Sequence, residues 1–214
     1  IENARIPTPG SYRSSTKSIG DPDDIERLAD ILLNAERPAV LFGQQVWASG
    51  SHNAAINFIR SLDIPAYMNG ASRGMLLEGD PHHFDRTRSD AFKEADVILI
   101  VGTPFDFRMG YGKRISDKAI LVQIDQSYAT VGKNRDISMG IAGDPGAILN
   151  AVEQAASGRI SKDIKEKRQD WMSKLRLIEE AKLEKLIPIF KSDQSPIHPY
   201  RLAYEINEFL GDDT

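Results

Sequence analysis

Two segments place ligand-type residues directly after a buried apolar run. Residues 97–101 are five consecutive apolar residues, and a glycine-rich turn follows them at residues 102–112. Residues 119–125 form a second apolar run that ends in Asp125. Because open α/β sheets hold ligands at the carboxyl ends of their strands, Asp125 could accept hydrogen bonds from ribose hydroxyls or adenine. The alternative is that Asp125 caps a helix or forms an Asx turn.

The sequence lacks the residue patterns that several other kinds of chemistry require. The sequence has no cysteine, which excludes disulfides, thiol catalysis and thiolate metal sites. His82 and His83 are adjacent, so on an extended segment their side chains point to opposite sides. In addition, no third metal ligand stands at a suitable spacing from them. Ser89, Asp90 and His52 form no recognisable nucleophilic triad, and neither a Gly-x-Gly-x-x-Gly fingerprint nor a P-loop is present. We predict no catalytic residue and no metal ligand.

The elements that position Asp125 and the glycine-rich turn alternate between strand and helix. Apolar periodicity, Pro and Gly predict helices at residues 21–37, 51–62, 90–94 and 144–156, and strands at residues 39–43, 64–68, 97–101, 120–125 and 138–142. Repeated βαβ units give parallel strands with helices on both faces. The expected fold class is therefore α/β: a doubly wound, mostly parallel, Rossmann-like sheet with a C-terminal helical extension.

The chain divides into three parts. Residues 1–20 are rich in Pro, Gly and Ser and are expected to be a linker, residues 21–157 a nucleotide-binding-type α/β domain, and residues 158–214 a helical linker. A long helix ending before Pro188 should bury a stripe against this domain or against others; the stripe comprises Ile160, Ile164, Trp171, Leu175, Ile178 and Leu186. Residues 159–191 carry a net charge of +4. This charge indicates either a solvated helical face or a surface that docks another domain.

Composition excludes several classes of protein. The 214 residues are 41% hydrophobic and 27% charged, which allows one sizeable core. A net charge of −4 argues against a nucleic-acid partner. No apolar run is long enough to span a membrane, and the start shows no signal peptide. We expect a soluble, cytoplasmic protein.

The order of these segments resembles one family. Residues 37–43, 64–70, 102–108, 119–125 and 132–144 are similar to the central domain of thiamin-diphosphate enzymes of the acetolactate synthase group, which includes oxalyl-CoA decarboxylase and 2-hydroxyacyl-CoA lyase. The similarity runs from about residue 21 to residue 152. Residues 195–210 resemble the linker and first helix that enter the third domain of those enzymes.

The resemblance implies a whole enzyme of which this chain is one part. Such an enzyme decarboxylates a 2-oxo acid such as pyruvate and condenses the product with a second carbonyl, using thiamin diphosphate and Mg²⁺. The family's catalytic glutamate and its Gly-Asp-Gly…Asn motif lie in N- and C-terminal domains that this chain lacks, so the fragment itself is expected to be inactive. Those domains are its implied partners, in a homo-oligomer when full length.

The resemblance also implies cofactor-binding residues around the sheet edge. Gly43 and Gln44 stand where flavin-binding members have a glycine-rich loop, although a turn needing positive φ at Gly43 is equally consistent with the sequence. Gly70 and Arg73 belong to the segment that passes beside the flavin or ADP, and Arg73 could meet a phosphate. The alternative for that segment is a turn stabilised by Asn69.

The turn after residues 97–101 departs from the family pattern. Gly102, Thr103, Phe105 and Arg108 align with a segment that contacts the flavin phosphates, but Pro104 replaces an arginine there. We therefore expect ADP to be preferred over FAD, with Arg108 as a diphosphate contact or as a surface pair with Asp106. Rival functions are a stand-alone adenine-nucleotide module, a 2-hydroxyacyl-CoA lyase or oxalyl-CoA decarboxylase relative, and a domain with an empty crevice.

Overall fold

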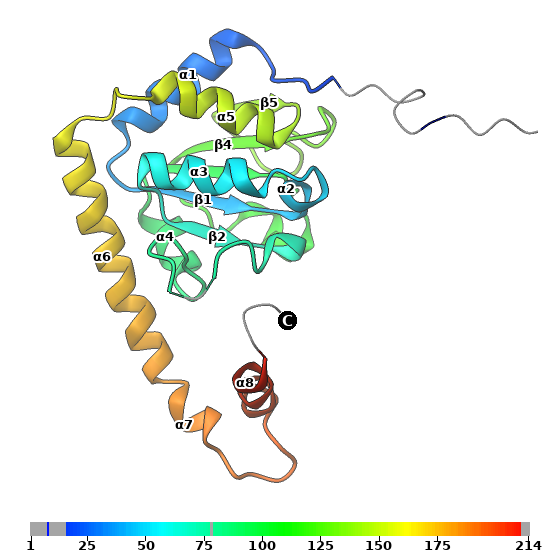
Figure 1. The fold of residues 1–214 in the computed structure, drawn as a ribbon, viewed down its shortest axis with the longest axis vertical. Helices are drawn as coiled ribbons and strands as arrows, with labels where there is room; N and C mark the ends of the chain where they lie inside the picture. Colours follow the sequence, from blue (N-terminus) through cyan, green and yellow to red (C-terminus); the bar gives the residue numbers. More distant parts are fainter. Residues whose placement is uncertain (1–7, 9–15, 78, 211–214) are drawn as a thin grey trace, which may run out of the picture.

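One sheet of five parallel strands forms the centre of the molecule (Figure 1). The computed structural model describes residue 8, residues 16–77 and residues 79–210. The strands lie in the order β2-β1-β3-β4-β5, and they are β1 (Pro38–Phe42), β2 (Ala66–Met68), β3 (Val97–Val101), β4 (Ile120–Asp125) and β5 (Met139–Ala142). The chain leaves β1 toward β2 and returns to β3 on the other side of β1. The carboxyl ends of β1 and β3 therefore flank the switch point, where open sheets hold ligands.

Helices cover both faces of the sheet, which confirms the predicted fold class. One face packs against helices α1 (Pro22–Asn34), α2 (Gln44–Ala48), α3 (His52–Leu62) and α5 (Pro145–Ala156). The other packs against α4 (Arg88–Glu94) and the long helix α6 (Lys162–Glu184). Two 3-10 turns, η1 (Gly70–Ser72) and η2 (Phe107–Gly112), follow β2 and β3. β1 and β3 are buried along their whole length, as an unbroken apolar run requires.

Capping residues fix the starts of two helices, α1 and α5. Asp21 accepts a hydrogen bond from the backbone of Asp23 at 2.9 Å, and Pro22 begins α1. Asp144 accepts one from Ala147 at 2.9 Å, followed by Pro145. The Asp144 carboxylate also pairs with Lys17 at 3.1 Å. Residues just before α1 therefore lie against the start of α5.

Two buried charged residues attach α6 to the domain. The guanidinium of Arg168 is fully buried and donates to the carbonyls of Leu32, Ala35 and Leu62, at the C-terminal ends of α1 and α3. The Leu32 carbonyl also accepts from the Ala35 N–H at 3.3 Å, and a cation at these last-turn carbonyls adds a donor and complements both helix dipoles. The Glu179 carboxylate accepts from the backbone of Arg86 and Thr87 at 2.8 and 3.0 Å. Burial lowers the pKa of Arg168 to about 10.

The predicted apolar stripe of α6 is thus only partly right. Trp171 and Leu175 are buried against this domain, but the other residues of the stripe are only partly buried. The indole N–H of Trp171 donates to the carbonyl of Pro38 at 3.0 Å, at the start of β1. Arg168 and Glu179 take the remaining buried positions on this side. The helix also ends at Glu184, and Pro188 lies inside the separate helix α7 (Ile187–Phe190).

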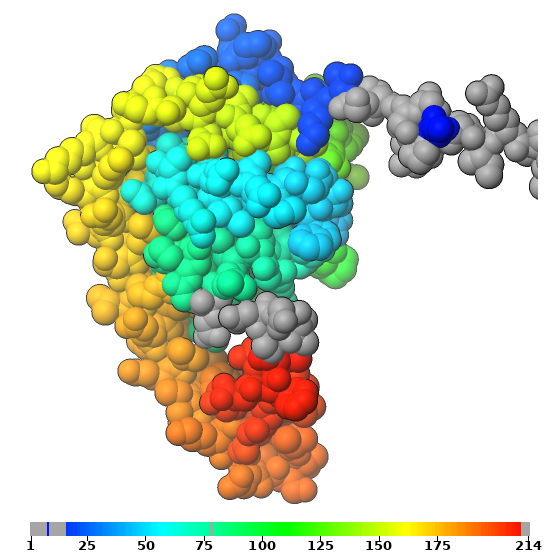
Figure 2. Space-filling model, in the orientation of Figure 1, coloured from blue at the N-terminus to red at the C-terminus, as the bar shows by residue number. Residues whose placement is uncertain are grey.

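Beyond α6 the chain forms an arm that extends away from the sheet (Figures 1 and 2). It consists of α7 and α8 (Pro199–Phe209), which contact each other through the stacked rings of Phe190 and Tyr204 at 5.2 Å. No residue of α8 is buried. In the described part of the chain, no helix has the length and apolarity that a membrane crossing needs.

Candidate functional site

The turns after β1 and β3 lie in direct contact at the switch point. The N–H of Gly43 donates to the carbonyl of Val101 at 2.7 Å, and the N–H of Gln45 donates to that of Gly102 at 3.3 Å. The positive φ considered for Gly43 is wrong, because its φ is −109°. Gly43 is required for a different reason: a Cβ there would lie 2.4 Å from the Gly102 carbonyl oxygen. The two turns approach more closely than any side chain allows.

Gly102 completes this contact from the other side. Its φ is +68°, and a Cβ on it would lie 2.6 Å from the Cβ of Gln45. The neighbouring Thr103 is buried. The first turn of α2, which would otherwise offer free N–H groups to an anion, thus faces a carbonyl of the same chain. Protein atoms fill the space between these two turns.

Asp125 lies beside these turns and bonds to Gln45. The carboxylate is fully buried, and its Oδ1 accepts from Gln45 Nε2 at 3.0 Å and from the Ser127 N–H at 2.8 Å. Gln45 Oε1 in turn accepts from the Gln126 N–H at 2.9 Å. The bond to Ser127 is the Asx turn that the sequence allowed. Asp125 Oδ2 is buried and has no hydrogen-bond partner among the described residues.

The residues expected after β2 lie in two places. Gly70 begins η1, and a Cβ on it would stand 3.6 Å from the Cβ of Gln44, so η1 and α2 are neighbours. Arg73 is exposed and lines a cavity of about 160 Å³ together with Arg86 and Arg88. Burial, together with the charges of Arg73 and Arg114, lowers the pKa of Arg88. This small cavity is positively charged, but its relation to a nucleotide stays a prediction.

Phe105 and Arg108 are committed to other contacts. The Phe105 side chain is buried in the core beneath α4 and α6. The Arg108 side chain is 55% exposed, and its Nε donates to Asp106 Oδ2 at 2.9 Å. The hydrogen bond from Arg108 holds the pKa of Asp106 below its usual value, against a smaller effect of burial. The predicted Asp106/Arg108 surface pair is therefore present, and the cofactor roles of Phe105 and Arg108 stay predictions.

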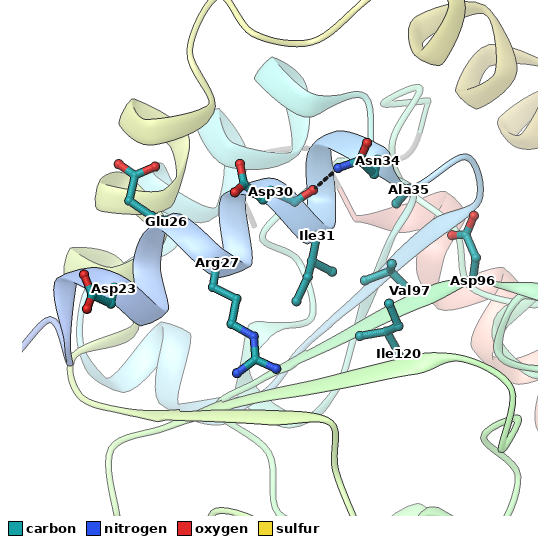
Figure 3. A pocket seen from close by; sticks show the side chains of 10 residues that line it. All are labelled: Asp23, Glu26, Arg27, Asp30, Ile31, Asn34, Ala35, Asp96, Val97 and Ile120. Atoms are coloured by element: carbon teal, nitrogen blue, oxygen red, sulfur yellow. Dashed lines mark hydrogen bonds between the residues drawn. The ribbon is translucent and has the colours of Figure 1, made fainter.

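A larger cavity of about 630 Å³ lies at the opposite edge of the sheet (Figure 3). Residues of α1, among them Asp23, Arg27 and Ile31, face the start of β3 at Val97 and the start of β4 at Ile120. These are the amino ends of the strands. The cavity is therefore separate from the predicted nucleotide crevice.

No metal-type cluster of three or more His, Asp or Glu side chains occurs among the described residues. His82 lies between Asp63 and Asp80, with nitrogen–oxygen distances of 3.5 Å to each carboxylate. The Asp80 carboxylate also pairs with Arg60 at 2.7 Å. Asp80 also accepts from the His82 backbone N–H at 2.9 Å, so Arg60 and the backbone already occupy this carboxylate.

Sequence reasoning missed Gln45 and Gln126 at this edge of the sheet. Gln45 lies 80 positions from Asp125 along the chain, so no local pattern links the two residues. A usable signal exists: carboxamide side chains follow Gly43 where flavin-binding members of the family have further glycines.

Fold and site together define a class. The chain is a doubly wound α/β domain with a switch point between β1 and β3, and its described residues contain no cluster of three or more His, Asp or Glu side chains that could hold a metal. Residues 25–152 match the family described as the central domain of thiamine pyrophosphate enzymes, and the chain belongs to that family.

Relatives of known type agree with this assignment. Over 188 residues the chain is 32% identical to the acetolactate synthase large subunit IlvG of Mycobacterium tuberculosis, covering 88% of this chain and 33% of that protein. It is 26% identical over 200 residues to 2-hydroxyacyl-CoA lyase 2 of Danio rerio, covering 90% and 31%. The chain therefore spans about a third of the length of these relatives.

A solved structure shares the fold. The crystal structure of benzoylformate decarboxylase from Polynucleobacter necessarius superimposes with a TM-score of 0.56 at 18% sequence identity. The superposition covers 71% of this chain and 30% of that one.

Proposed function

We propose that this chain is the central, non-catalytic domain of a thiamin-diphosphate-dependent enzyme of the acetolactate synthase type. The complete enzyme decarboxylates a 2-oxo acid such as pyruvate and joins the product to a second carbonyl. The observation that carries the proposal is the match of residues 25–152 to the central-domain family, together with 32% identity to an acetolactate synthase large subunit.

The described residues do not fit thiamin diphosphate or Mg²⁺. Two Gly-Asp pairs, Gly79-Asp80 and Gly143-Asp144, superficially resemble a diphosphate motif. Their carboxylates are already used, by Arg60 at Asp80 and by Lys17 and the α5 N-terminus at Asp144. In the proposed enzyme, parts of the protein outside this chain hold the cofactor and its metal. This domain supplies a rigid sheet between them.

The switch point supports a second, finer proposal, an adenine nucleotide at this edge of the sheet. The unpartnered Oδ2 of Asp125 fits a hydrogen-bond donor of an adenosine, because a buried carboxylate oxygen without a donor is costly. ADP is preferred over FAD, since Pro104 supplies no guanidinium where flavin-binding members have arginine. Calorimetric titration with both nucleotides tests this preference, and tighter binding of FAD would contradict it.

The partners of the domain are the remaining domains of its own enzyme, in a cytoplasmic homo-oligomer. The arm formed by α7 and α8 supports this proposal. Ile206 and Phe209 are exposed on a helix with no buried residue, and their apolar surface would be covered by a neighbouring domain.

The test of the main proposal uses the complete enzyme. Purified full-length protein, given pyruvate, thiamin diphosphate and Mg²⁺, is expected to form acetolactate, and omission of thiamin diphosphate should abolish the product. The similarity to 2-hydroxyacyl-CoA lyase 2 supplies the competing assay. Cleavage of a 2-hydroxyacyl-CoA without acetolactate formation would move the enzyme to that branch. No activity in either assay would overturn the proposal.

A further inference from the structure

Gln45 presents a hydrogen-bonding edge of the same kind as a nucleobase. Its carboxamide offers one N–H donor beside one carbonyl acceptor, as adenine does through its 6-amino group and N1. The donor meets Asp125 Oδ1 at 3.0 Å, and the acceptor meets the Gln126 N–H at 2.9 Å. A carboxylate and an adjacent backbone N–H are the two groups that such an edge requires.

We infer that Gln45 is a built-in occupant of the crevice, and that its carboxamide takes the donor–acceptor pair that would otherwise bind the base of an adenine nucleotide. The inference rests on the proposed nucleotide-type crevice and identifies the residue that determines whether it is open. In this chain a nucleotide must displace Gln45 before its base can reach Asp125 and Gln126.

Burial and packing around Asp125 support a filled site. The Asp125 carboxylate is fully buried, whereas Gln45 is half-buried and Gln126 is exposed, so the Gln45 side chain lies between the acid and solvent. Asp125 Oδ2 lacks a partner among the described residues, so the Gln45 carboxamide satisfies only one of the two carboxylate oxygens. Removing the Gln45 side chain beyond Cβ would expose both acceptor and donor.

The Gln45 side chain can be displaced while its backbone stays in place. Its backbone is held by the bond to the Gly102 carbonyl, and the hydrogen bonds of its side chain among the described residues are the two to Asp125 and Gln126. An incoming base must break both bonds before it can form its own bonds to the same two groups. Their combined free energy therefore lowers nucleotide affinity in the parent by at least tenfold.

The test measures ADP binding by calorimetry to the chain and to Gln45→Ala. The variant is expected to bind ADP at least tenfold more tightly than the parent. Gln154→Ala is the control, because Gln154 is an exposed glutamine on α5, outside the crevice, and is expected to leave ADP binding unchanged. Gln45→Ser, checked by its thermal melt, serves if the alanine variant is poorly folded.

Two further measurements test whether the gain in ADP affinity depends on the 6-amino group of the base and on Asp125. Purine riboside 5′-diphosphate lacks the 6-amino donor but keeps N1, so its gain on Gln45→Ala should be smaller than that of ADP. Asp125→Asn added to Gln45→Ala should remove the gain for ADP. If both Gln45 variants fold and bind ADP no better than the parent, the inference is wrong, whatever the activity of the full-length enzyme. If the full-length enzyme forms no acetolactate while Gln45→Ala gains affinity, the proposed reaction fails and the crevice inference stands.

Discussion

At the residue scale, Gly102 combines a backbone conformation and a contact that no other residue tolerates. Its φ of +68° disfavours any side chain, and the Cβ of Gln45 occupies the space where its own would lie. We predict that Gly102→Val destabilises the domain by roughly 3 kcal/mol or more, because steric and φ penalties add. Urea unfolding of the variant and the parent measures the difference.

Gly110 supplies the matched control for Gly102. It has a similar φ of +55°, but nothing lies within 4 Å of a Cβ built on it. Gly110→Ala should therefore cost only about 1–2 kcal/mol, the conformational part alone. Equal costs for Gly102→Ala and Gly110→Ala would show that the contact with Gln45 contributes nothing.

His83 and Asp85 form a pair that makes stability depend on pH. Their nitrogen–oxygen distance is 3.5 Å, and the hydrogen bond raises the pKa of His83 above 6.5 and lowers that of Asp85 below 3.8. The histidine contribution is full below pH 6.5 and is lost as pH rises through the raised pKa. The Asp85 contribution is full above pH 3.8 and is lost as pH falls through the lowered pKa. The pair therefore stabilises most between about pH 4 and 6.5.

The corresponding prediction concerns the slope of stability between pH 5.5 and pH 8.5. His83→Gln should reduce the loss of unfolding free energy over this interval, and Asp85→Asn should do the same. Because one interaction is shared, the double variant should show no further reduction. Chemical unfolding at the two pH values measures it, and additive effects of the two substitutions would argue against a pair.

Asp125 and Gln45 mark the limit of sequence reasoning at this scale. The strand-end acid could be predicted, because the apolar run before it fixes the position of a carboxyl edge. Its partner could not, since the bond to Gln45 joins two turns that only the folded sheet brings together. The same holds for Gly43, whose role depends on the carbonyl of Gly102.

At the scale of elements, the attachment of α6 depends on Arg168. We predict that Arg168→Met lowers the free energy of unfolding by roughly 3–5 kcal/mol, because three buried carbonyls lose their donor. Arg159→Met is the control: Arg159 is 44% exposed and pairs with Glu26 and Asp30 on the surface, so its loss should cost under about 1 kcal/mol. Urea unfolding compares them, and similar costs would contradict the assigned role of Arg168.

The elements differ in how well their sequence predicts them. β3 was predictable because five consecutive apolar residues leave the strand no polar face for solvent. Such a strand is therefore expected to be buried on both faces. Helix α2 was missed, since five residues are too few for a periodic pattern. Arg168 and Glu179 of α6 read as solvated charges from sequence, because only the ends of α1 and α3 and the start of α4 make their burial favourable.

At the scale of the whole molecule, we predict that the chain alone does not turn over pyruvate. Its described residues supply neither an acid beside the cofactor nor a site for the diphosphate and its metal. Because whole catalytic elements are missing, we expect turnover to be absent, and not merely the affinity for the cofactor to be lower by a few kcal/mol. An acetolactate assay with thiamin diphosphate and Mg²⁺, run beside the full-length enzyme, measures this. Product above the no-enzyme blank would contradict the assignment as a non-catalytic domain.

Arg168 also determines when, during synthesis of the chain, the ends of α1 and α3 are stabilised. Between 106 and 136 residues separate it from the carbonyls that it satisfies. During synthesis at about 5–20 residues per second, roughly 5 to 30 s pass between the appearance of those acceptors and that of their donor. Over this interval the carbonyls of Ala35 and Leu62, at the ends of α1 and α3, lack the donor that Arg168 later supplies. Nascent chains stalled before residue 168 should be cleaved there by a protease that spares chains extended past residue 184.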